Sequence, residues 1–327
     1  MRAMIEERPS PPAILARLDA TALFSLGLLL ASFALLALVL TLTGLRVDWT
    51  GLGLCIVFSI ATVALGLALK LCGSRSRIAS FALVLGALIG STVCNTMSVN
   101  AGMRLHFPMI DDYLYAADQV LGFDSGRLLH VFAAHPALTG LLQLAYENAN
   151  WIVVMAIIAA SLRRERAWYP LVMYSGSLLL IAILCILMPA EGNVAYSGLA
   201  YLQHQGLPSG SGTYYLDTLR YYYDGHGEVV SNAHLSGVAV FPSFHMVMGL
   251  TIATSLRGTR LHGLAAAFGI LVMISAIPIG GHYVVDLIAG SVVWVIMTYL
   301  AGLFEHPAPA DPDWQFGEFA QSGLAAA

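Results

Sequence analysis

Two short stretches of the sequence combine residues that could carry out chemistry at a phosphate group. The first, FPSFH, ends at His245, and the second, GGHYVVD, contains His282 and ends at Asp286. His282 and Asp286 are four residues apart, a spacing that places both side chains on one face of a helix. There the carboxylate can accept the proton of one imidazole nitrogen and leave the other nitrogen free to attack. The two residues can therefore be interpreted as a histidine nucleophile with an orienting carboxylate. The alternative interpretation is a His–Asp pair with a purely structural role.

Pro242 and Ser243 stand at the expected start of a helix. Proline fits the first turn, and the serine hydroxyl can cap the helix or donate outward. The free N–H groups and the positive dipole end of a helix N-terminus suit a phosphate, although an ordinary capping turn has the same residues. Taken with the two histidines, this set indicates covalent phosphoryl transfer without a metal ion. A zinc site is the alternative interpretation of two histidines and one aspartate.

The composition of the chain indicates which elements must position these residues. The chain has 327 residues, of which 58% are hydrophobic and only 10% charged, and its mean hydropathy is +0.77. A soluble domain has about 25% charged residues, so a water-soluble monomer is excluded. The net charge of −4 offers no basic surface for nucleic acid. The four cysteines have no close pair and are interpreted as small apolar residues. We therefore expect an all-α fold, a polytopic bundle of membrane helices.

Crossing the hydrocarbon core takes about 20 apolar residues. Eight stretches meet this requirement, at residues 20–42, 52–71, 78–97, 138–160, 168–188, 238–256, 261–279 and 283–304. The two stretches with chemistry lie at the starts of the sixth and the eighth of these spans. Because the seventh span is a single return crossing, we expect His245, His282 and Asp286 at the same membrane face.

The distribution of Lys and Arg predicts the orientation of the spans. With a cytoplasmic N-terminus, 11 of the 15 cationic residues lie on the cytoplasmic side, and the other four are Arg46, Arg104, Arg127 and Arg220. We therefore expect a multi-pass protein of the cell membrane with both termini in the cytoplasm and an extracytoplasmic site. The outer segments are 98–137, which is typical of short interfacial helices, and 189–237. The second is rich in tyrosine and indicates either an aromatic belt or a substrate lid.

The motif Pro-Ser-x-His at 242–245, followed by Ser-x6-His-x3-Asp at 275–286, resembles the type 2 phosphatidic acid phosphatase superfamily of membrane enzymes. In that superfamily the second motif normally reads Ser-Arg-x5-His-x3-Asp, but here Ala276 occupies the Arg position. The upstream Lys-x6-Arg-Pro motif is also missing. These departures are similar to those of the inositol phosphorylceramide synthase branch. The resemblance covers roughly residues 105–300 and implies a six-helix phosphatase-like core.

This resemblance also implies a domain division and a mechanism. Residues 101–304 would form the catalytic membrane domain, and residues 1–100, the N-terminal transmembrane helices, lie outside the resemblance. Residues 305–327 also lie outside it, and their Pro- and Ala-rich composition predicts a disordered cytoplasmic tail. His282 would attack phosphorus to form a phosphohistidine, while Asp286 holds its tautomer. His245 would protonate the departing oxygen and then deprotonate the incoming alcohol or water. Ser243 would bind a phosphoryl oxygen, and no metal or other cofactor is implied.

Two further residues are candidates for substrate binding. Arg220 is the outer-face arginine closest in sequence to the site, so it is the best substitute for the missing motif cations; an arginine anchored to lipid phosphate is the alternative. Glu147 lies inside the fourth span, where a carboxylate usually faces a bundle interior or a polar cavity. It could steer an acceptor hydroxyl, hold a histidine, or belong to a polar seam between helices.

These observations predict an enzyme that acts on the phosphoester head groups of membrane lipids. A lipid phosphotransferase similar to inositol phosphorylceramide synthase is the favoured function, and a lipid phosphate or pyrophosphate phosphatase that uses water is the alternative. The expected partners are a phospholipid or sphingolipid substrate and a polyol or lipid alcohol acceptor. A transporter of an anionic substrate is the third hypothesis. It is disfavoured because the polar residues cluster at one face rather than at the midplane, and because no inverted repeat is visible.

Overall fold

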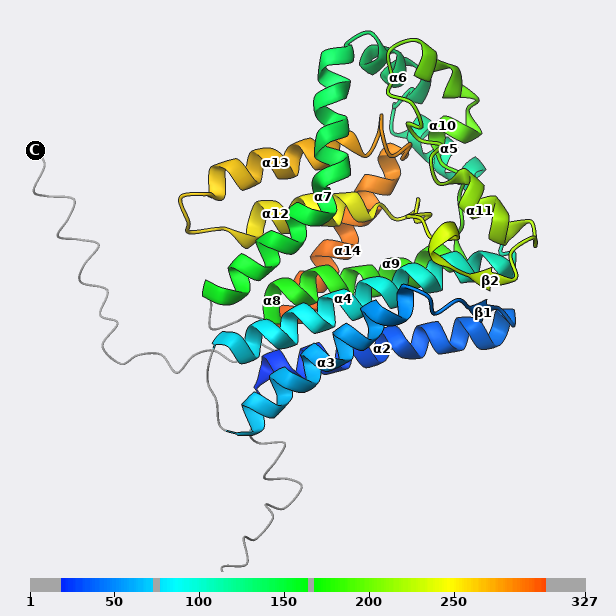
Figure 1. Ribbon diagram of the computed structural model, residues 1–327. Helices are drawn as coiled ribbons and strands as arrows, with labels where there is room; N and C mark the ends of the chain where they lie inside the picture. The colour runs from blue at the N-terminus through cyan, green and yellow to red at the C-terminus, as the bar shows by residue number, and fades with distance from the viewer. Residues whose placement is uncertain (1–18, 73–76, 164–167, 304–327) are drawn as a thin grey trace, which may run out of the picture.

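The computed structural model describes residues 19–72, 77–163 and 168–303 of the chain. The tail predicted at 305–327 lies outside the described residues. Outside them also lie six of the cationic residues in the orientation count, namely Arg2, Arg8, Arg17, Arg75, Arg164 and Arg166. Within the described ranges the regular structure is almost entirely helical (Figure 1), which confirms the predicted all-α class.

In the described part of the chain, six helices are long and apolar enough to cross a membrane, so this is a polytopic helical membrane protein. Each of the six overlaps one of the predicted spans. They are α2 (Ala20–Thr43), α3 (Leu52–Leu71), α4 (Arg77–Gly102) with its 3-10 extension η1 (Met103–Leu105), α7 (Pro136–Arg163), the continuous helix of α8 (Trp168–Leu171), the π-turn η2 (Val172–Gly176) and α9 (Ser177–Leu187), and α14 (Val284–Leu303).

The other two predicted spans, 238–256 and 261–279, are shorter helices, and the expectation of eight long spans is corrected accordingly. They are α12 (Phe244–Ser255) and α13 (His262–Ser275), with 12 and 14 residues. At 1.5 Å per residue these helices are about 18 and 21 Å long, against a hydrocarbon core of about 30 Å. Pro242 lacks an N–H and disfavours helical geometry in the residue before it, so the helix cannot begin at 238.

The two predicted outer segments gather at one end of the bundle as short helices (Figure 1). The amino ends of α12 and α14 point toward this same end, and α5 contacts α14. Strands β1 (Arg46–Val47) and β2 (Val229–Val230) pair in parallel and tie the α2–α3 connection to the second segment. The short helices are α5 (Asp111–Val120), α6 (Ser125–Ala133), α10 (Asn193–Tyr196), η3 (Leu199–His204), α11 (Leu216–Tyr223) and η4 (Asn232–His234).

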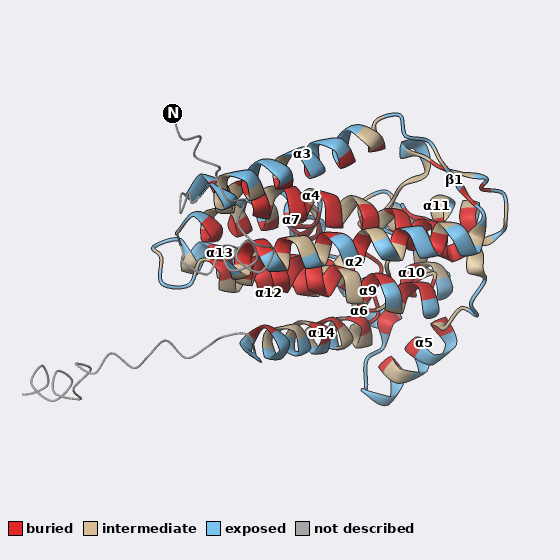
Figure 2. Cartoon of the chain, turned by 90° about the horizontal axis from the view of Figure 1, so that it is seen from below, coloured by how far each residue is buried: buried red, intermediate tan, exposed pale blue. Residues whose placement is uncertain are grey.

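The buried core runs along the centre of the bundle. The continuous helix α8–α9 and helix α4 are the most buried of the long helices, and Figure 2 shows their buried positions together with those of α12. The outward-facing side chains are nevertheless large and apolar, as at Leu54, Trp151 and Leu264. A large apolar surface of this kind marks contact with a membrane. The bundle therefore holds its polar residues inside and at one end, where the candidate site lies.

Candidate active site

His282 and Asp286 form a buried pair at the amino end of α14. Nδ1 of His282 lies 3.2 Å from Oδ2 of Asp286, and that same oxygen accepts the backbone N–H of Tyr283 at 2.9 Å. The side chain of His282 is 3% exposed and that of Asp286 is fully buried. The carboxylate can thus accept a hydrogen bond from a protonated Nδ1, which leaves the lone pair on Nε2. The sequence analysis expected both residues on one face of a helix, but His282 lies two residues before α14 begins, and the pair forms across the start of the helix.

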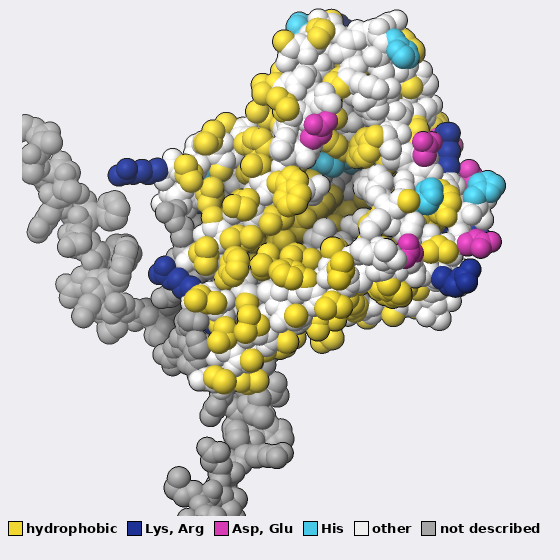
Figure 3. All heavy atoms as spheres, viewed as in Figure 1, with side chains coloured by type: hydrophobic (Ala, Val, Ile, Leu, Met, Phe, Trp, Pro, Cys, Tyr) yellow, Lys and Arg dark blue, Asp and Glu magenta, His cyan; other side chains and the backbone are white. Residues whose placement is uncertain are grey.

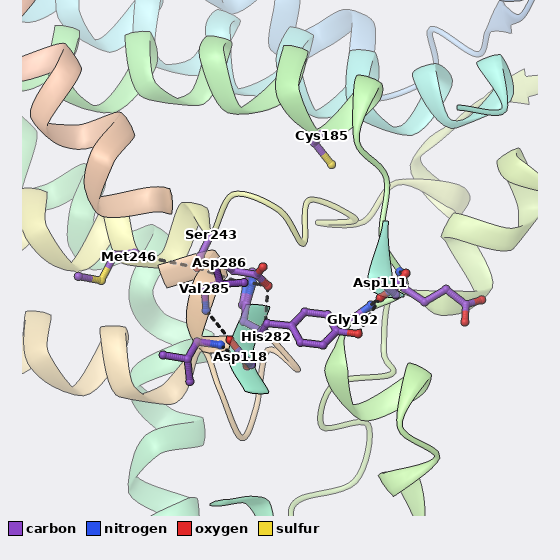
Figure 4. Close-up of polar contacts among 12 residues, drawn as sticks. Asp111, Asp118, Cys185, Gly192, Ser243, Met246, His282, Val285 and Asp286 are labelled. Carbon is purple, nitrogen blue, oxygen red and sulfur yellow. Dashed lines mark hydrogen bonds and ion pairs between the residues drawn. The ribbon is translucent and has the colours of Figure 1, made fainter. Parts of the chain in front are cut away.

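Ser243 faces the other ring nitrogen of His282. Its Oγ lies 3.4 Å from Nε2 and also accepts the backbone N–H of Met246, so Ser243 is the N-cap of α12 (Figure 4). The backbone N–H of Ser243 donates to the carbonyl oxygen of Asp286 at 3.0 Å. A Cβ at Gly290 would clash with the carbonyl oxygen of Ser243, so this glycine permits the close approach of α14 to α12. The hydroxyl and the imidazole are therefore held against each other by two helix ends.

His245 lies in the first turn of α12, next to the His282 pair. The ring centroids of His245 and His282 are 5.9 Å apart, with an angle of 64° between the planes. This separation matches the span of a phosphoryl group that makes one polar contact with each ring. In the described part of the chain, no three His, Cys, Asp or Glu side chains are grouped as metal ligands would be. The arrangement thus offers one imidazole for attack and a second for proton transfer.

Two aspartates of α5 support the His282 segment from the end of the bundle where the short helices gather, and the sequence analysis did not identify either of them. Asp118 accepts the backbone N–H groups of Val284 and Val285 at 2.9 and 2.8 Å, so its carboxylate binds the amino end of α14 (Figure 4). Asp111 accepts the hydroxyl of Tyr283 at 3.0 Å. Both carboxyl groups are buried, and burial raises the pKa of each above the ordinary value, against the lowering effect of these hydrogen bonds. Their spacing of seven residues, which places them on one face of α5, was the available signal.

A cavity of about 860 Å³ opens on the side of the bundle and reaches His245, whereas Ser243, His282 and Asp286 are not among its lining residues. Helices α4, α7, α9 and α12 form its walls, which are mostly apolar, and His245 lies on its surface. Figure 3 shows the hollow surrounded by hydrophobic side chains, with an acidic and a histidine side chain near it. Pockets of this size, with a few polar groups in an apolar wall, are typical of small-molecule sites. The cavity therefore offers His245 access to an apolar ligand.

The structure places Glu147 and Arg220 apart from His245, Ser243 and His282, the His–Ser–His group. Glu147 is exposed on the wall of the cavity, where its carboxylate accepts a hydrogen bond of 2.7 Å from the amide of Gln143. Arg220 lies on α11 and forms an ion pair of 3.2 Å with Glu191, and its side chain is about half exposed. The four residues that come together are thus His245, His282, Asp286 and Ser243.

A family model described as the PAP2 superfamily matches residues 112–300 of the chain. This match covers more than half of the sequence and includes α12, α13, the amino-terminal part of α14 and the residues of the site. No curated protein and no solved structure matches the chain significantly.

Proposed function

Because the chain belongs to the PAP2 superfamily, we propose that it is a lipid phosphotransferase that works through a phosphohistidine on His282. Enzymes of this superfamily are metal-independent phosphatases and phosphotransferases. The observation that carries the proposal is the buried His282–Asp286 pair with the Ser243 hydroxyl on the remaining ring nitrogen. This is the arrangement that an oriented nucleophile next to an oxygen-binding group requires.

The reaction has two steps. In the first, Nε2 of His282 bonds to phosphorus, the bond from phosphorus to the leaving alcohol breaks, and His245 donates a proton to that oxygen. In the second, His245 takes the proton of the acceptor hydroxyl, the acceptor oxygen bonds to phosphorus, and the N–P bond breaks. Ser243 donates a hydrogen bond to a phosphoryl oxygen in both steps, and Asp286 stabilises the His282 tautomer that attacks.

The cavity supports a lipid as the substrate. His245 lies on its wall, so the alcohol that leaves and the alcohol that enters both occupy this side of the reacting phosphorus. The apolar walls favour alcohols with long hydrocarbon parts. Transfer to a second lipid or polyol is favoured over hydrolysis by the motif departures at Ala276 and upstream, which are similar to those of inositol phosphorylceramide synthases. A phosphatase that uses water as the acceptor is the alternative.

Arg220 and Glu147 are proposed to bind the substrate at the edges of the site. Arg220 approaches the phosphate after exchanging its partner Glu191 for the substrate, and so replaces the motif arginine. Glu147 binds a hydroxyl of the acceptor from the cavity wall, in place of its bond with Gln143.

We further propose that the site faces the extracytoplasmic side, with both termini in the cytoplasm. The α12–α13 pair enters the membrane from the outer end and returns to it. This pair does not alter which side the termini occupy, because it adds either two crossings or none. We also propose the division into N-terminal helices at residues 1–100 and a catalytic domain at residues 101–304, which the family match at residues 112–300 supports.

The test is an assay of purified protein with labelled phospholipids, with and without ceramide or polyol acceptors. We expect new labelled lipid when an acceptor is present and activity that survives EDTA. After a short reaction the protein should carry an acid-labile, alkali-stable phosphate, which His282→Ala should abolish. Free phosphate as the sole product would select the phosphatase alternative. Activity that is lost with EDTA and restored by zinc or magnesium would overturn the histidine mechanism.

A further inference from the structure

The ring of Tyr146, on α7, contacts both histidine-bearing segments of the site. It stacks on the ring of His245, with centroids 4.0 Å apart and planes only 16° from parallel. A Cβ at Gly280 would lie 2.9 Å from the Tyr146 ring and 2.9 Å from the ring of His282. Tyr146 thus fills the space between α12 and the segment that leads to His282. The side chain is 9% exposed, so its ring has little freedom to move.

The two histidines are held in different ways. His282 has a hydrogen-bond partner at each ring nitrogen, whereas within the described residues neither ring nitrogen of His245 has one. The second torsion angle of a histidine side chain is broad, so without a partner the plane of the ring is poorly defined. The stack on Tyr146 is therefore the contact that sets the plane of His245, and with it the direction of its ring nitrogens.

Tyr146 is in turn fixed by the outer segment. Its hydroxyl lies 2.8 Å from the hydroxyl of Tyr214, and the ring of Tyr214 packs edge-on against Tyr215 at 5.1 Å. Tyr215 is buried and donates its hydroxyl to the carbonyl oxygen of Glu191. This row of aromatic side chains connects the wall of the cavity to the same outer segment that Asp111 binds.

We propose that Tyr146 is a positioning residue for His245, and that Tyr214 holds Tyr146 in place. The inference rests on the proposed role of His245 as the proton donor to the leaving alcohol. Proton transfer requires a ring nitrogen aimed at the departing oxygen, and the stack supplies this aim.

The test compares leaving alcohols in two matched pairs of substrates, phosphatidic acid with nitrophenyl phosphate, and phosphatidylinositol with nitrophenyl inositol phosphate. Within each pair the phosphoryl group is the same and the leaving alcohol differs. Nitrophenol leaves without help from a general acid. In single-turnover reactions, which report the first step alone, Tyr146→Leu should therefore slow release of the lipid alcohol about 10-fold or more but release of nitrophenol about 3-fold or less. Tyr146→Phe keeps the stack, so its rate of release of the lipid alcohol should fall less than that of Tyr146→Leu. Tyr214→Phe should show the same smaller loss of rate as Tyr146→Phe.

Tyr174 offers the matched control. It is buried, lines the same cavity, and packs edge-on against Phe244 at 5.1 Å, one residue before His245. Tyr174→Leu should lower the rate of alcohol release from both substrates of a pair by the same factor. Equal losses on lipid and nitrophenyl ester in Tyr146→Leu, in a monodisperse protein, would overturn the positioning role. A wild-type protein inactive on all four substrates would instead contradict the proposed function.

Discussion

The hydroxyl of Ser243 lies 3.4 Å from Nε2 of His282, the ring nitrogen that the Asp286 contact leaves available for attack. The two residues are 39 positions apart and belong to the amino ends of different helices. A phosphoryl oxygen bound by this hydroxyl would therefore lie next to the attacking atom. The group proposed to bind the phosphate and the atom proposed to attack phosphorus are therefore neighbours.

Removing this hydroxyl should slow the chemical step. We expect Ser243→Ala to lower kcat by about 10²-fold, the loss typical of one donor to a developing oxyanion. The variant also loses a helix cap, which costs about 1 kcal/mol in the free energy of unfolding. Asp124→Ala provides the control, because Asp124 caps α6 by accepting the N–H of Arg127 and lies outside the His–Ser–His group. The proposed role fails if both variants lower kcat equally when compared at matched fractions of folded protein.

Asp118 should make the stability depend on pH. Burial raises its pKa in the folded protein above the ordinary value of 3.8, so the folded state binds the proton more tightly than the unfolded chain. The contribution to stability is complete below the unfolded pKa and is lost as the pH rises through the folded pKa. Relative to Asp118→Asn, the wild type should therefore lose thermal stability as the pH rises from about 4 toward 7.

The measurement is Tm in detergent at several pH values for both proteins. Other carboxyl groups titrate alike in both, so the difference in Tm isolates Asp118. Asp112→Asn, on the same helix but with an exposed carboxyl group bonded to Tyr196, is the matched control. If the wild type gained stability over Asp118→Asn as the pH rose, the bonds from Val284 and Val285 would outweigh the burial, and the sign of the prediction would be wrong.

The order of the spans predicted that His245 and His282 would lie close together, whereas it did not predict the contacts that support them. His245 and His282 were expected at one face because a single return crossing separates them, and the structure brings their rings within 5.9 Å. The contacts of Asp118 reach residues 166 and 167 positions away, and such contacts depend on how α5 folds back onto α14. The spacing of residues along the chain carries no information on that docking.

The lengths of α12 and α13 show a second limit. The apolar stretch that was predicted as the span 238–256 begins with Val238 and Val240, which precede α12. Both side chains are buried in the bundle, but their backbone is not helical. Apolar composition therefore marked burial in protein and not a longer membrane helix. The strands β1 and β2 are two residues each, too short for any periodic pattern to reveal.

Glu147→Gln should affect the acceptor and not the donor. The amide keeps the shape of the side chain and can still bond to Gln143, but it accepts a hydrogen bond from a hydroxyl more weakly than a carboxylate does. We expect the phosphoenzyme to form at the wild-type rate, while KM for the acceptor rises several-fold. Rapid-quench labelling measures the first step, and varying the acceptor concentration measures the second. A slower formation of phosphoenzyme would assign Glu147 to donor binding instead.

The two histidines should respond differently to the leaving group. His282→Ala removes the attacking nitrogen, so no phosphoenzyme should form and turnover should fall to background with every substrate. His245→Ala retains that nitrogen but must expel an unprotonated alkoxide, so it should stall on a lipid substrate. Its defect should shrink when nitrophenol replaces the lipid alcohol, because a leaving oxygen that already tolerates negative charge needs little help from an acid. Release of the alcohol in the first turnover by both variants on the two substrates, with labelling of the protein in each case, measures this difference, because the second step is the same for both substrates. Rescue of His282→Ala by the nitrophenyl ester, with His245→Ala inactive, would require the two roles to be exchanged.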